Sequence, residues 1–369
     1  MEKSPGKIGI REYISIILLM IGVKLSDDTP AIFIEYLGSA YWMAPLIIGA
    51  LSFIPIYLMI KVITLYKDKN LHDSILHLFG KYLGNVFSII LLLFGIAALI
   101  IDSAQYVDII GTMYFTKTPT FIIYLVLMGA SAYIAKKGLE HIGTIAWLVL
   151  FYIKFSLFVA LIFSLRQGSV SFLFPLFGYG AGKVLKESVS HVSIFADFFY
   201  LGLIAPYIIS AKAFKKGTMI GLFIVSIELC FTFLVFLFVF DYEGLKMINY
   251  PYHEVIRVIR LGFLTNVETF FFPFWIIATF IRFSFYLYLI AIFLGGICKI
   301  QKFEFLIPPM ATIVVFIGMM PEAPTFTNFF LRDALLNILS PLFFSFPILM
   351  WLVAKIKGEF KRGKAKQHV

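Results

Sequence analysis

Long apolar runs, separated by short polar stretches, dominate the chain from one end to the other. Ten of these runs reach the length of about 17 or more mainly apolar residues that an α-helix needs to cross a lipid bilayer. The predicted spans cover residues 9–36, 40–63, 84–110, 119–135, 139–165, 185–210, 217–240, 267–297, 304–320 and 334–355. This pattern predicts an all-α polytopic membrane protein with about ten transmembrane helices, in which residues 1–369 form a single transmembrane domain.

Polar residues interrupt the first span. After Met20 the sequence reads Ile-Gly-Val-Lys-Leu-Ser-Asp-Asp-Thr-Pro, which places a lysine and two aspartates inside an apolar run. Unpaired backbone groups are costly in lipid, so a helix breaks there only where protein or a water-filled cavity covers the break. Transporters use such discontinuous helices to build substrate sites near the middle of the membrane. The alternative is that the span ends near Leu25 and that an outer loop follows.

Two shorter segments are amphipathic and do not span the membrane. Between the second and third spans, apolar residues follow a helical period at Leu71, Ile75, Leu78, Phe79, Tyr82 and Leu83. Between the seventh and eighth spans they do so at Tyr252, Val255, Ile256, Ile259 and Phe263, with Arg257 and Arg260 on the other face. The two segments hold the same place in two five-span halves, on opposite sides of the membrane. This predicts an inverted repeat of about residues 8–165 and 185–355, the alternative being two interfacial helices placed so by chance.

The repeat requires that the sixth span, the counterpart of the first, be interrupted too. Span six reads Ser193-Ile-Phe-Ala-Asp-Phe-Phe-Tyr-Leu-Gly-Leu-Ile-Ala-Pro206, with Asp197 at mid-depth. A proline inside a helix removes a backbone hydrogen bond and crowds the preceding turn. We therefore predict breaks in both the first and the sixth span.

Composition and charge support a membrane protein. The chain is 61% hydrophobic and 14% charged, and its mean hydropathy is +0.95. The loops on one side hold 20 of the 31 lysines and arginines, whereas the opposite loops hold 8. Because basic residues favour the cytoplasmic side, both termini, including the basic tail 356–369, are predicted to be cytoplasmic. The net charge of +10 then faces lipid headgroups, and no nucleic acid partner is expected.

Charged residues inside the spans are expensive to bury and are therefore candidates for function. Lys24 lies in the first break, where either a local ion pair with Asp27 and Asp28 or a direct contact with a ligand is expected. Lys154 lies midway along the fifth span, either as a cation that gains and loses a proton or as a structural partner of a carboxylate or of free carbonyl groups.

Four further charges lie within spans: Asp102, Asp197, Glu228 and Arg282. We expect Arg282 to be a buried pairing residue, because its guanidinium group stays charged. For Asp102 and the nearby Asp108, a solvated outer vestibule is the plain alternative to a functional role.

The sequence contains no catalytic constellation and no metal motif. Gly178, Gly180 and Gly182 form a weak GxGxG pattern on the predicted outer side, where no nucleotide is expected. Cys230 and Cys298 lie in or beside apolar runs without metal-type spacing. We therefore expect no enzymatic activity, no metal and no cofactor.

The chain resembles the amino acid–polyamine–organocation transporters and, more narrowly, the spore germination permeases, the B subunits of nutrient germinant receptors in endospore-forming bacteria. The resemblance covers about residues 8–355. Its most specific stretches are Phe195-Ala-Asp197 followed by Pro206, and Tyr250-Pro-Tyr-His-Glu-Val-Ile-Arg257 with Trp275 downstream. Relatives tend to have aromatic–glycine–glutamate at the first stretch, so Ala196 and Asp197 are conservative departures. Asn266 stands where relatives tend to carry a basic residue before Glu268, so a salt bridge in this loop does not carry over.

The resemblance implies a LeuT-like bundle with broken helices one and six, in a bacterial membrane, the spore inner membrane. It implies a subunit that binds a small nutrient, often an amino acid, and acts together with the A and C subunits of a germinant receptor. It also implies that Lys154 lies at the depth where proton-coupled relatives place a lysine in the cation position.

We expect the ligand site between the two breaks, where the N-terminal ends of half-helices offer N–H groups and a positive dipole to a carboxylate. The residues predicted to line it are Gly22, Val23, Ser26, Phe195, Ala196 and Phe199, with Phe94, Ala98, Ser284 and Tyr288 closing the sides. Lys24, Lys154, Asp197 and Arg282 are the predicted buried or ion-coupling charges. Because the lining is largely apolar, a small or hydrophobic ligand side chain is expected.

Two other functions are consistent with the sequence. One is an amino acid symporter driven by protons, in which Lys154 is the coupling group. The other is a membrane scaffold that only anchors partner subunits, although a pure anchor has no need of charges inside the membrane.

Overall fold

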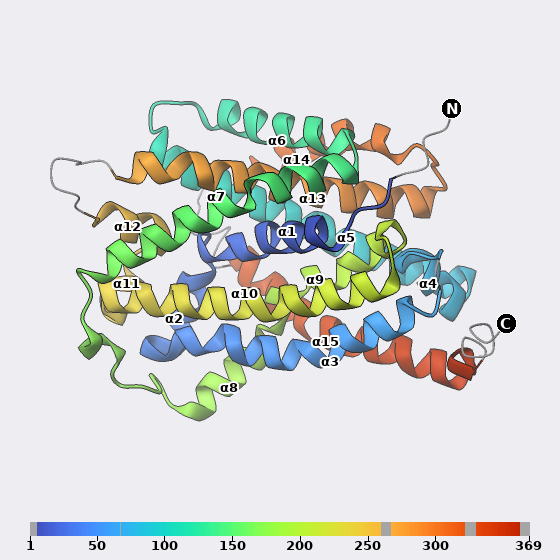
Figure 1. The fold of residues 1–369 in the computed structure, drawn as a ribbon, viewed down its shortest axis with the longest axis horizontal. Helices are drawn as coiled ribbons and strands as arrows, with labels where there is room; N and C mark the ends of the chain where they lie inside the picture. Colours follow the sequence, from blue (N-terminus) through green and yellow to red (C-terminus); the bar gives the residue numbers. More distant parts are fainter. Residues whose placement is uncertain (1–5, 67, 260–266, 322–329, 362–369) are drawn as a thin grey trace.

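In the computed structural model, the described residues 6–66, 68–259, 267–321 and 330–361 form a bundle of helices that run mostly along one common direction (Figure 1). The main helices are α1 (Ile10–Met20), α2 (Thr29–Leu37), α3 (Ala44–Ile63), α5 (Lys81–Ile109), α6 (Thr120–Lys136), α7 (Leu139–Leu165), α10 (Ala211–Val239), α13 (Glu268–Cys298), α14 (Ile307–Gly318) and α15 (Asp333–Ile356). Shorter helices are α4 (Leu71–Phe79), α8 (Ala181–Ser190), α9 (Asp197–Tyr200), α11 (Tyr242–Lys246) and α12 (Pro251–Arg257). Single turns and short 3-10 or π segments are η1 (Gly22–Leu25), η2 (Gly38–Met43), η3 (Ile110–Tyr114), η4 (Val170–Leu173), η5 (Val192–Phe195), η6 (Leu201–Tyr207) and η7 (Phe303–Leu306).

Each of the ten predicted spans coincides with helical structure in the described chain. By length and apolar composition, six continuous helical stretches are long enough to cross a membrane: Thr29–Ile63, Lys81–Tyr114, Leu139–Leu165, Ala211–Val239, Glu268–Cys298 and Phe330–Ile356. A seventh is formed if Ala181–Ser190 and Val192–Tyr207, which meet at an angle of 51°, count as one span. Thr120–Lys136 and Phe303–Gly318 are shorter apolar helices. The chain is therefore an all-helical integral membrane protein, and the count of ten spans stays a prediction.

The first helix, α1, lies at the centre of the bundle and packs against α7, α10 and α13. It approaches α10 closely because Gly217 and Gly221 on α10 face Tyr13 and Ile17 on α1. A Cβ atom at either glycine would lie 2.5 Å from the side chain of Tyr13 or Ile17. Small residues four apart allow helices to meet in this way where lipid gives no hydrophobic drive for association.

The two predicted amphipathic segments lie at opposite ends of the bundle in Figure 1, α4 on the right and α12 on the left. We call these the α4 end and the α12 end. The segment that precedes α1 and the end of α15 both lie toward the α4 end (Figure 1). The Lys357 ammonium group also donates to the carbonyl of Leu78 on α4, at 2.7 Å. This arrangement agrees with the predicted inverted placement of the two short helices.

The boundaries of both amphipathic helices differ from the prediction. A capping box between Asn70 and Asp73 starts α4, but Gly80, at φ +80°, ends it after Phe79. Tyr82 and Leu83 therefore belong to α5, where 85% and 61% of their surfaces are exposed, so their assignment to the apolar face of the short helix was wrong. The second helix ends at Arg257, and Arg260, Phe263 and Asn266 lie outside the described residues.

Candidate functional site

The first predicted span is divided at its polar sequence. The α-helix α1 ends at Met20, the 3-10 turn η1 follows, and α2 begins at Thr29 with Pro30 in its first turn. Proline is accepted there because the first N–H groups of a helix have no partner within the helix. The side chain of Asp27 accepts one of these bonds, from the Thr29 N–H group at 2.8 Å. The two aspartates thus lie at the positive end of α2.

The predicted sixth span is also divided into short pieces, α8, η5, α9 and η6. Lys24 from the first break reaches this segment, where its ammonium group donates to the carbonyl of Ile194 at 2.5 Å and forms an ion pair with Asp197. The Tyr286 hydroxyl on α13 donates to the other carboxylate oxygen of Asp197, at 2.6 Å. Lys24 therefore joins the two breaks directly. It does not pair with its sequence neighbours Asp27 and Asp28, which was one of the two expectations.

Lys154 on α7 pairs with a carboxylate. Its ammonium group contacts Glu228 on α10 and donates to the carbonyl of Leu18, at 3.1 Å, near the end of α1. Gly22 faces this ion pair closely, since a Cβ atom there would lie 3.0 Å from the Lys154 nitrogen and 3.1 Å from Glu228 Oε2. The backbone of the first break is thus packed on the Lys154–Glu228 pair, and the glycine is what makes the approach possible.

Arg282 on α13 lies fully buried beside the end of α1. One of its nitrogens donates to the carbonyl of Met20 and another to Asp102 on α5, both at 2.5 Å. The guanidinium group is also 5.4 Å from the ring centroid of Tyr106 and 5.1 Å from that of Tyr286. Such cation–π contacts are strongest where the cation is removed from water. The pairing expected for Arg282 is observed, and Asp102, only 9% exposed, is its buried partner and does not line a solvated vestibule.

A second arginine, Arg332, precedes α15 and binds the end of the first break. It pairs with Asp27 at 3.0 Å and with Asp28, and Asp102 is 3.9 Å away. It also donates to the hydroxyl of Thr29, at 2.8 Å, and to the side chain of Gln105 on α5. The Arg332 side chain is 4% exposed. This residue links the first break, α5 and the last helix in one buried network.

Aromatic side chains cover the same break toward the α12 end. The indole N–H of Trp275 donates to the Ser26 hydroxyl at 2.8 Å, and its ring stacks on Tyr106 with centroids 5.7 Å apart. His253 of α12 packs edge-on against Trp275, and its Nδ1 is 2.8 Å from the Tyr114 hydroxyl. Burial lowers the pKa of His253 to about 3, because the charged imidazolium would lose its hydration. The ring therefore stays neutral in this stack.

The predicted lining residues fall into two groups. Gly22, Val23 and Ser26 lie together in the first break, and all three are buried. Phe195, Ala196 and Phe199 lie in the second break, where Ala196 and Phe199 face a cavity of about 10 Å³, close to the minimum for one water molecule.

The four residues predicted to close the sides lie on two long helices. Phe94 and Ala98 are half-buried on α5. Ser284 is buried on α13 and donates to the carbonyl of Phe280 at 2.5 Å. Tyr288, six residues beyond Arg282 on α13, packs its ring against Phe303 of η7. Their role as ligand contacts remains a prediction.

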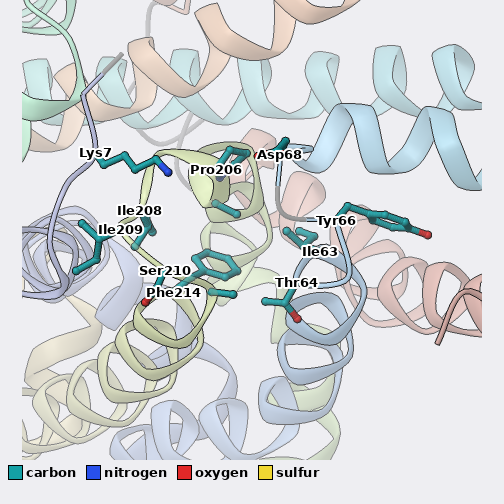
Figure 2. A pocket seen from close by; sticks show the side chains of 12 residues that line it. Lys7, Ile63, Thr64, Tyr66, Asp68, Pro206, Ile208, Ile209, Ser210 and Phe214 are labelled. Carbon is teal, nitrogen blue, oxygen red and sulfur yellow. The ribbon is translucent and has the colours of Figure 1, made fainter. Parts of the chain in front are cut away.

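A larger cavity, of about 320 Å³, lies at the α4 end (Figure 2). It is bordered by the N-terminal segment, the end of α3, the end of η6 and the start of α10. Its lining includes Lys7, Thr64, Asp68, Pro206 and Ser210. On one wall the backbones of Ile8 and Ile208 form a parallel β-bridge, in which the Ile8 N–H donates to the Tyr207 carbonyl at 2.9 Å and the Ile209 N–H to the Ile8 carbonyl at 3.1 Å. The N-terminal segment is thus attached to the exit of the second break.

Sequence reasoning missed Arg332, which was counted as a loop residue, and it did not assign Glu228, Tyr286 or Trp275 their partners. One signal was present in the sequence. More than three residues from either end, the predicted spans contain five acids, Asp27, Asp28, Asp102, Asp197 and Glu228, against three bases, Lys24, Lys154 and Arg282. Buried acids require counter-charges, so this excess indicated a further cation from outside the predicted spans.

The site contains paired charges, carbonyl groups and aromatic rings, and no group of three or more potential metal ligands occurs among the residues that the structure describes. This arrangement suits binding and conformational change. The fold is that of a transporter: MHP1, a nucleobase-cation-symport-1 family transporter solved in a closed conformation with bromovinylhydantoin bound, superposes with a TM-score of 0.62. The match covers 92% of this chain and 77% of that protein at 13% identity, and it confirms the predicted transporter fold.

Within this class, the chain belongs to the spore germination protein family, whose model matches residues 10–327. Spore germination protein KB of Bacillus subtilis is 24% identical over 99% of this chain and 98% of its own length. Spore germination protein YndE of the same organism is 21% identical over 88% of both chains. The resemblance inferred from the sequence is therefore confirmed, and the family and fold are those of permeases and receptors and not of enzymes.

Proposed function

We propose that this protein is the nutrient-binding subunit of a spore germinant receptor. It senses a small ligand, an amino acid, between the breaks of the first and sixth spans. It acts with the A and C subunits of the receptor in the spore inner membrane, with both termini in the cytoplasm. The Lys24–Asp197 pair, which joins the two breaks, is the observation that carries this proposal.

The pair favours a ligand with both charges of an α-amino acid. Separating Lys24 from Asp197 in a buried site leaves two uncompensated charges, and breaking such a pair typically costs about 3–5 kcal/mol. The carboxylate of an amino acid can replace Asp197 beside Lys24, while its ammonium group pairs with Asp197. A neutral or singly charged ligand offers at most one of these replacements. Phe195 and Phe199, two residues from Asp197 on either side in the chain, are buried and apolar, which suits a small or apolar side chain.

Sensing requires that binding alter the contacts between the two breaks. In the structure the first break is covered by side chains: Trp275 donates a hydrogen bond to Ser26, and Arg332 pairs with both Asp27 and Asp28. A ligand that separates Lys24 from Asp197 changes the relation between the two halves of the bundle. We infer that this change is the signal passed to the partner subunits.

The experiment is a thermal-shift measurement on the purified full-length protein, because a ligand that binds the folded state raises its apparent stability. Alanine and leucine are compared with alaninamide, which lacks the carboxylate, and with propionate, which lacks the ammonium group. We expect stabilisation by the amino acids alone. In Lys24→Met, amino acids should lose their effect while alaninamide gains one, because Asp197 is then free to bind a cation. Stabilisation by neutral compounds that is unchanged in Lys24→Met would contradict the proposed site.

The alternative function is a proton-coupled amino acid symporter. The observation that favours it is the position of Lys154, whose ammonium group lies against the end of α1 and the carboxylate of Glu228. Uptake of labelled amino acid into proteoliposomes, measured with and without a pH gradient, distinguishes the receptor from the symporter. Binding without uptake supports the receptor, whereas gradient-driven uptake that is abolished in Lys154→Ala supports the symporter.

A further inference from the structure

The buried network around Arg332 does not balance its charges. Ion pairs connect Arg332 to Asp27, Asp28 and Asp102, and Asp102 in turn to Arg282. Two guanidinium groups thus face three carboxylates, which leaves one negative charge in excess when all are ionised. The other two pairs of the core, Lys24–Asp197 and Lys154–Glu228, are each neutral and supply no spare cation.

The ends of the helices do not remove this excess. The positive end of α2 faces Asp27 and Asp28, and the negative end of α1, at the Met20 carbonyl, faces Arg282. Each end carries about half an elementary charge, of opposite sign. The two contributions roughly cancel, so the network keeps a charge of about −1.

Burial makes an uncompensated carboxylate expensive, and the usual outcome is that it takes up a proton or a cation. The residues of the network are buried: Asp27 is 0% exposed, Asp28 1% and Arg282 0%. No group of potential metal ligands occurs among the described residues, which favours a proton over a metal ion.

The hydrogen bonds identify which carboxyl group would hold the proton. Asp27 uses both oxygens, accepting from Thr29 and from Arg332. Asp102 accepts from Arg282 and has Arg332 beside its other oxygen. Asp28 accepts from Arg332 through Oδ1, while its Oδ2 has no hydrogen-bond partner among the described residues.

We propose that Asp28 Oδ2 is a proton-binding site at the first break, which binds one proton from the solvent and makes the Arg332 network neutral. The only bond formed is the O–H bond of the carboxyl group. Release of this proton restores a buried excess charge among Asp27, Asp28 and Asp102, facing Arg332, Arg282, Thr29 and Gln105. The network at the first break is therefore tightest when protonated, and its loosening is linked to proton release. This site is separate from Lys154 and does not depend on the nutrient.

The test compares wild type with Asp28→Asn, which imitates the protonated carboxyl group. Melting temperatures of the full-length protein in detergent, without nutrient, are measured from pH 5 to pH 9. Because all other titrating groups are shared, the difference between the two curves isolates Asp28. We expect the wild type to fall progressively below the variant as the pH rises from 5, because the folded state keeps a proton that the unfolded chain, in which an aspartate titrates near 3.9, has already released. A difference that stays constant with pH overturns the proposal.

Asp27→Asn is the matched control. It also neutralises the network but removes an acceptor for Thr29 and Arg332, so it should melt below Asp28→Asn at every pH. Equal melting of the two variants would overturn the assignment to Asp28.

Two further measurements keep the proposal testable if a variant fails to fold. At pH 7, wild-type protein should show the infrared carbonyl band of a buried protonated carboxyl group, and its absence overturns the proposal. At a constant pH of 8, replacing choline by sodium or potassium should leave the melting temperature unchanged. A rise with one of these ions would assign the missing charge to a metal cation instead.

Discussion

The ammonium group of Lys24, in the first break, lies between the carbonyl of Ile194 and the carboxylate of Asp197, in the second break, 173 residues away in the chain. The two interruptions of the chain are thereby connected by an ion pair and a hydrogen bond as well as by packing.

Replacing one member of the Lys24–Asp197 pair should lower the free energy of unfolding more than replacing both. Lys24→Met or Asp197→Asn leaves a buried charge without its partner, for which a loss of about 3–5 kcal/mol is typical. The double variant leaves no charge behind and should be more stable than either single one. Denaturation of the four proteins in detergent, arranged as a double-mutant cycle, gives the coupling energy. Additive effects would mean that the two side chains do not form an ion pair in the membrane.

Replacing Trp275 by Phe should loosen the cover over the first break. The variant keeps an aromatic ring beside Tyr106 but loses the N–H group that donates to Ser26. The loss of one hydrogen bond is worth about 1 kcal/mol. If the proposed site opens on this side, the equilibrium shifts toward the open form, and spores should respond at a several-fold lower nutrient concentration. Ser26→Ala removes the same bond from the other partner and should have the same effect; opposite effects would contradict this prediction.

Side chains at position 22 should interfere with the Lys154–Glu228 pair. The Cβ atom of Gly22→Ala would lie 3.0 Å from the lysine nitrogen, and overpacking of this kind typically costs about 1–3 kcal/mol. Gly22→Trp should abolish the nutrient response while the protein remains in the membrane. Gly129→Ala is the control, because a Cβ atom there has no neighbour within 4 Å among the described residues. A normal response in Gly22→Trp would exclude a ligand site at the first break.

The stack around His253 should weaken in acid. The pKa of His253 is lowered by burial to about 3, whereas an unfolded histidine titrates near 6.5. The neutral His253 ring therefore makes its full contribution to the free energy of unfolding above pH 6.5. This contribution declines as the pH falls toward 3, by up to about 1.4 kcal/mol per pH unit, because the unfolded histidine becomes protonated and the folded one does not. Melting curves of wild type and His253→Gln should converge as the pH decreases from 7 to 5. This trend is opposite in sign to that expected for Asp28, so the two effects can be separated.

The positions of the helices could be predicted because the bilayer imposes a minimum apolar length. The interruption at Lys24 and its counterpart at Asp197 were visible for the same reason, since polar residues inside such runs are rare. The exposed surfaces of Tyr82 and Leu83 were not predictable from hydropathy. Lipid is as apolar as a protein core, so an apolar residue on a membrane helix carries no information about which of the two it faces.

The partners of the charges could not be predicted from proximity in the chain. Lys24 is three residues from Asp27, but the 3-10 turn between them directs the lysine toward the second break and leaves both aspartates to Arg332. Arg332 directly precedes the last helix, about 300 residues later in the chain, and only the fold brings it there. The sequence indicated that a counter-charge was missing, but its source required the structure.

The bridge between Ile8 and Ile208 gives the chain a mechanical property that its helices alone would not have. Two backbone hydrogen bonds attach the segment before α1 to the residues that follow Pro206 at the end of η6. The start of the first interrupted span and the end of the second are therefore hydrogen-bonded to each other at the α4 end. In the interior, the ion pair of Lys24 and Asp197 connects the same two spans. Movement of the second interrupted span would thus displace the backbone of the N-terminal segment as well. This segment lies at the end of the bundle where α15 also ends.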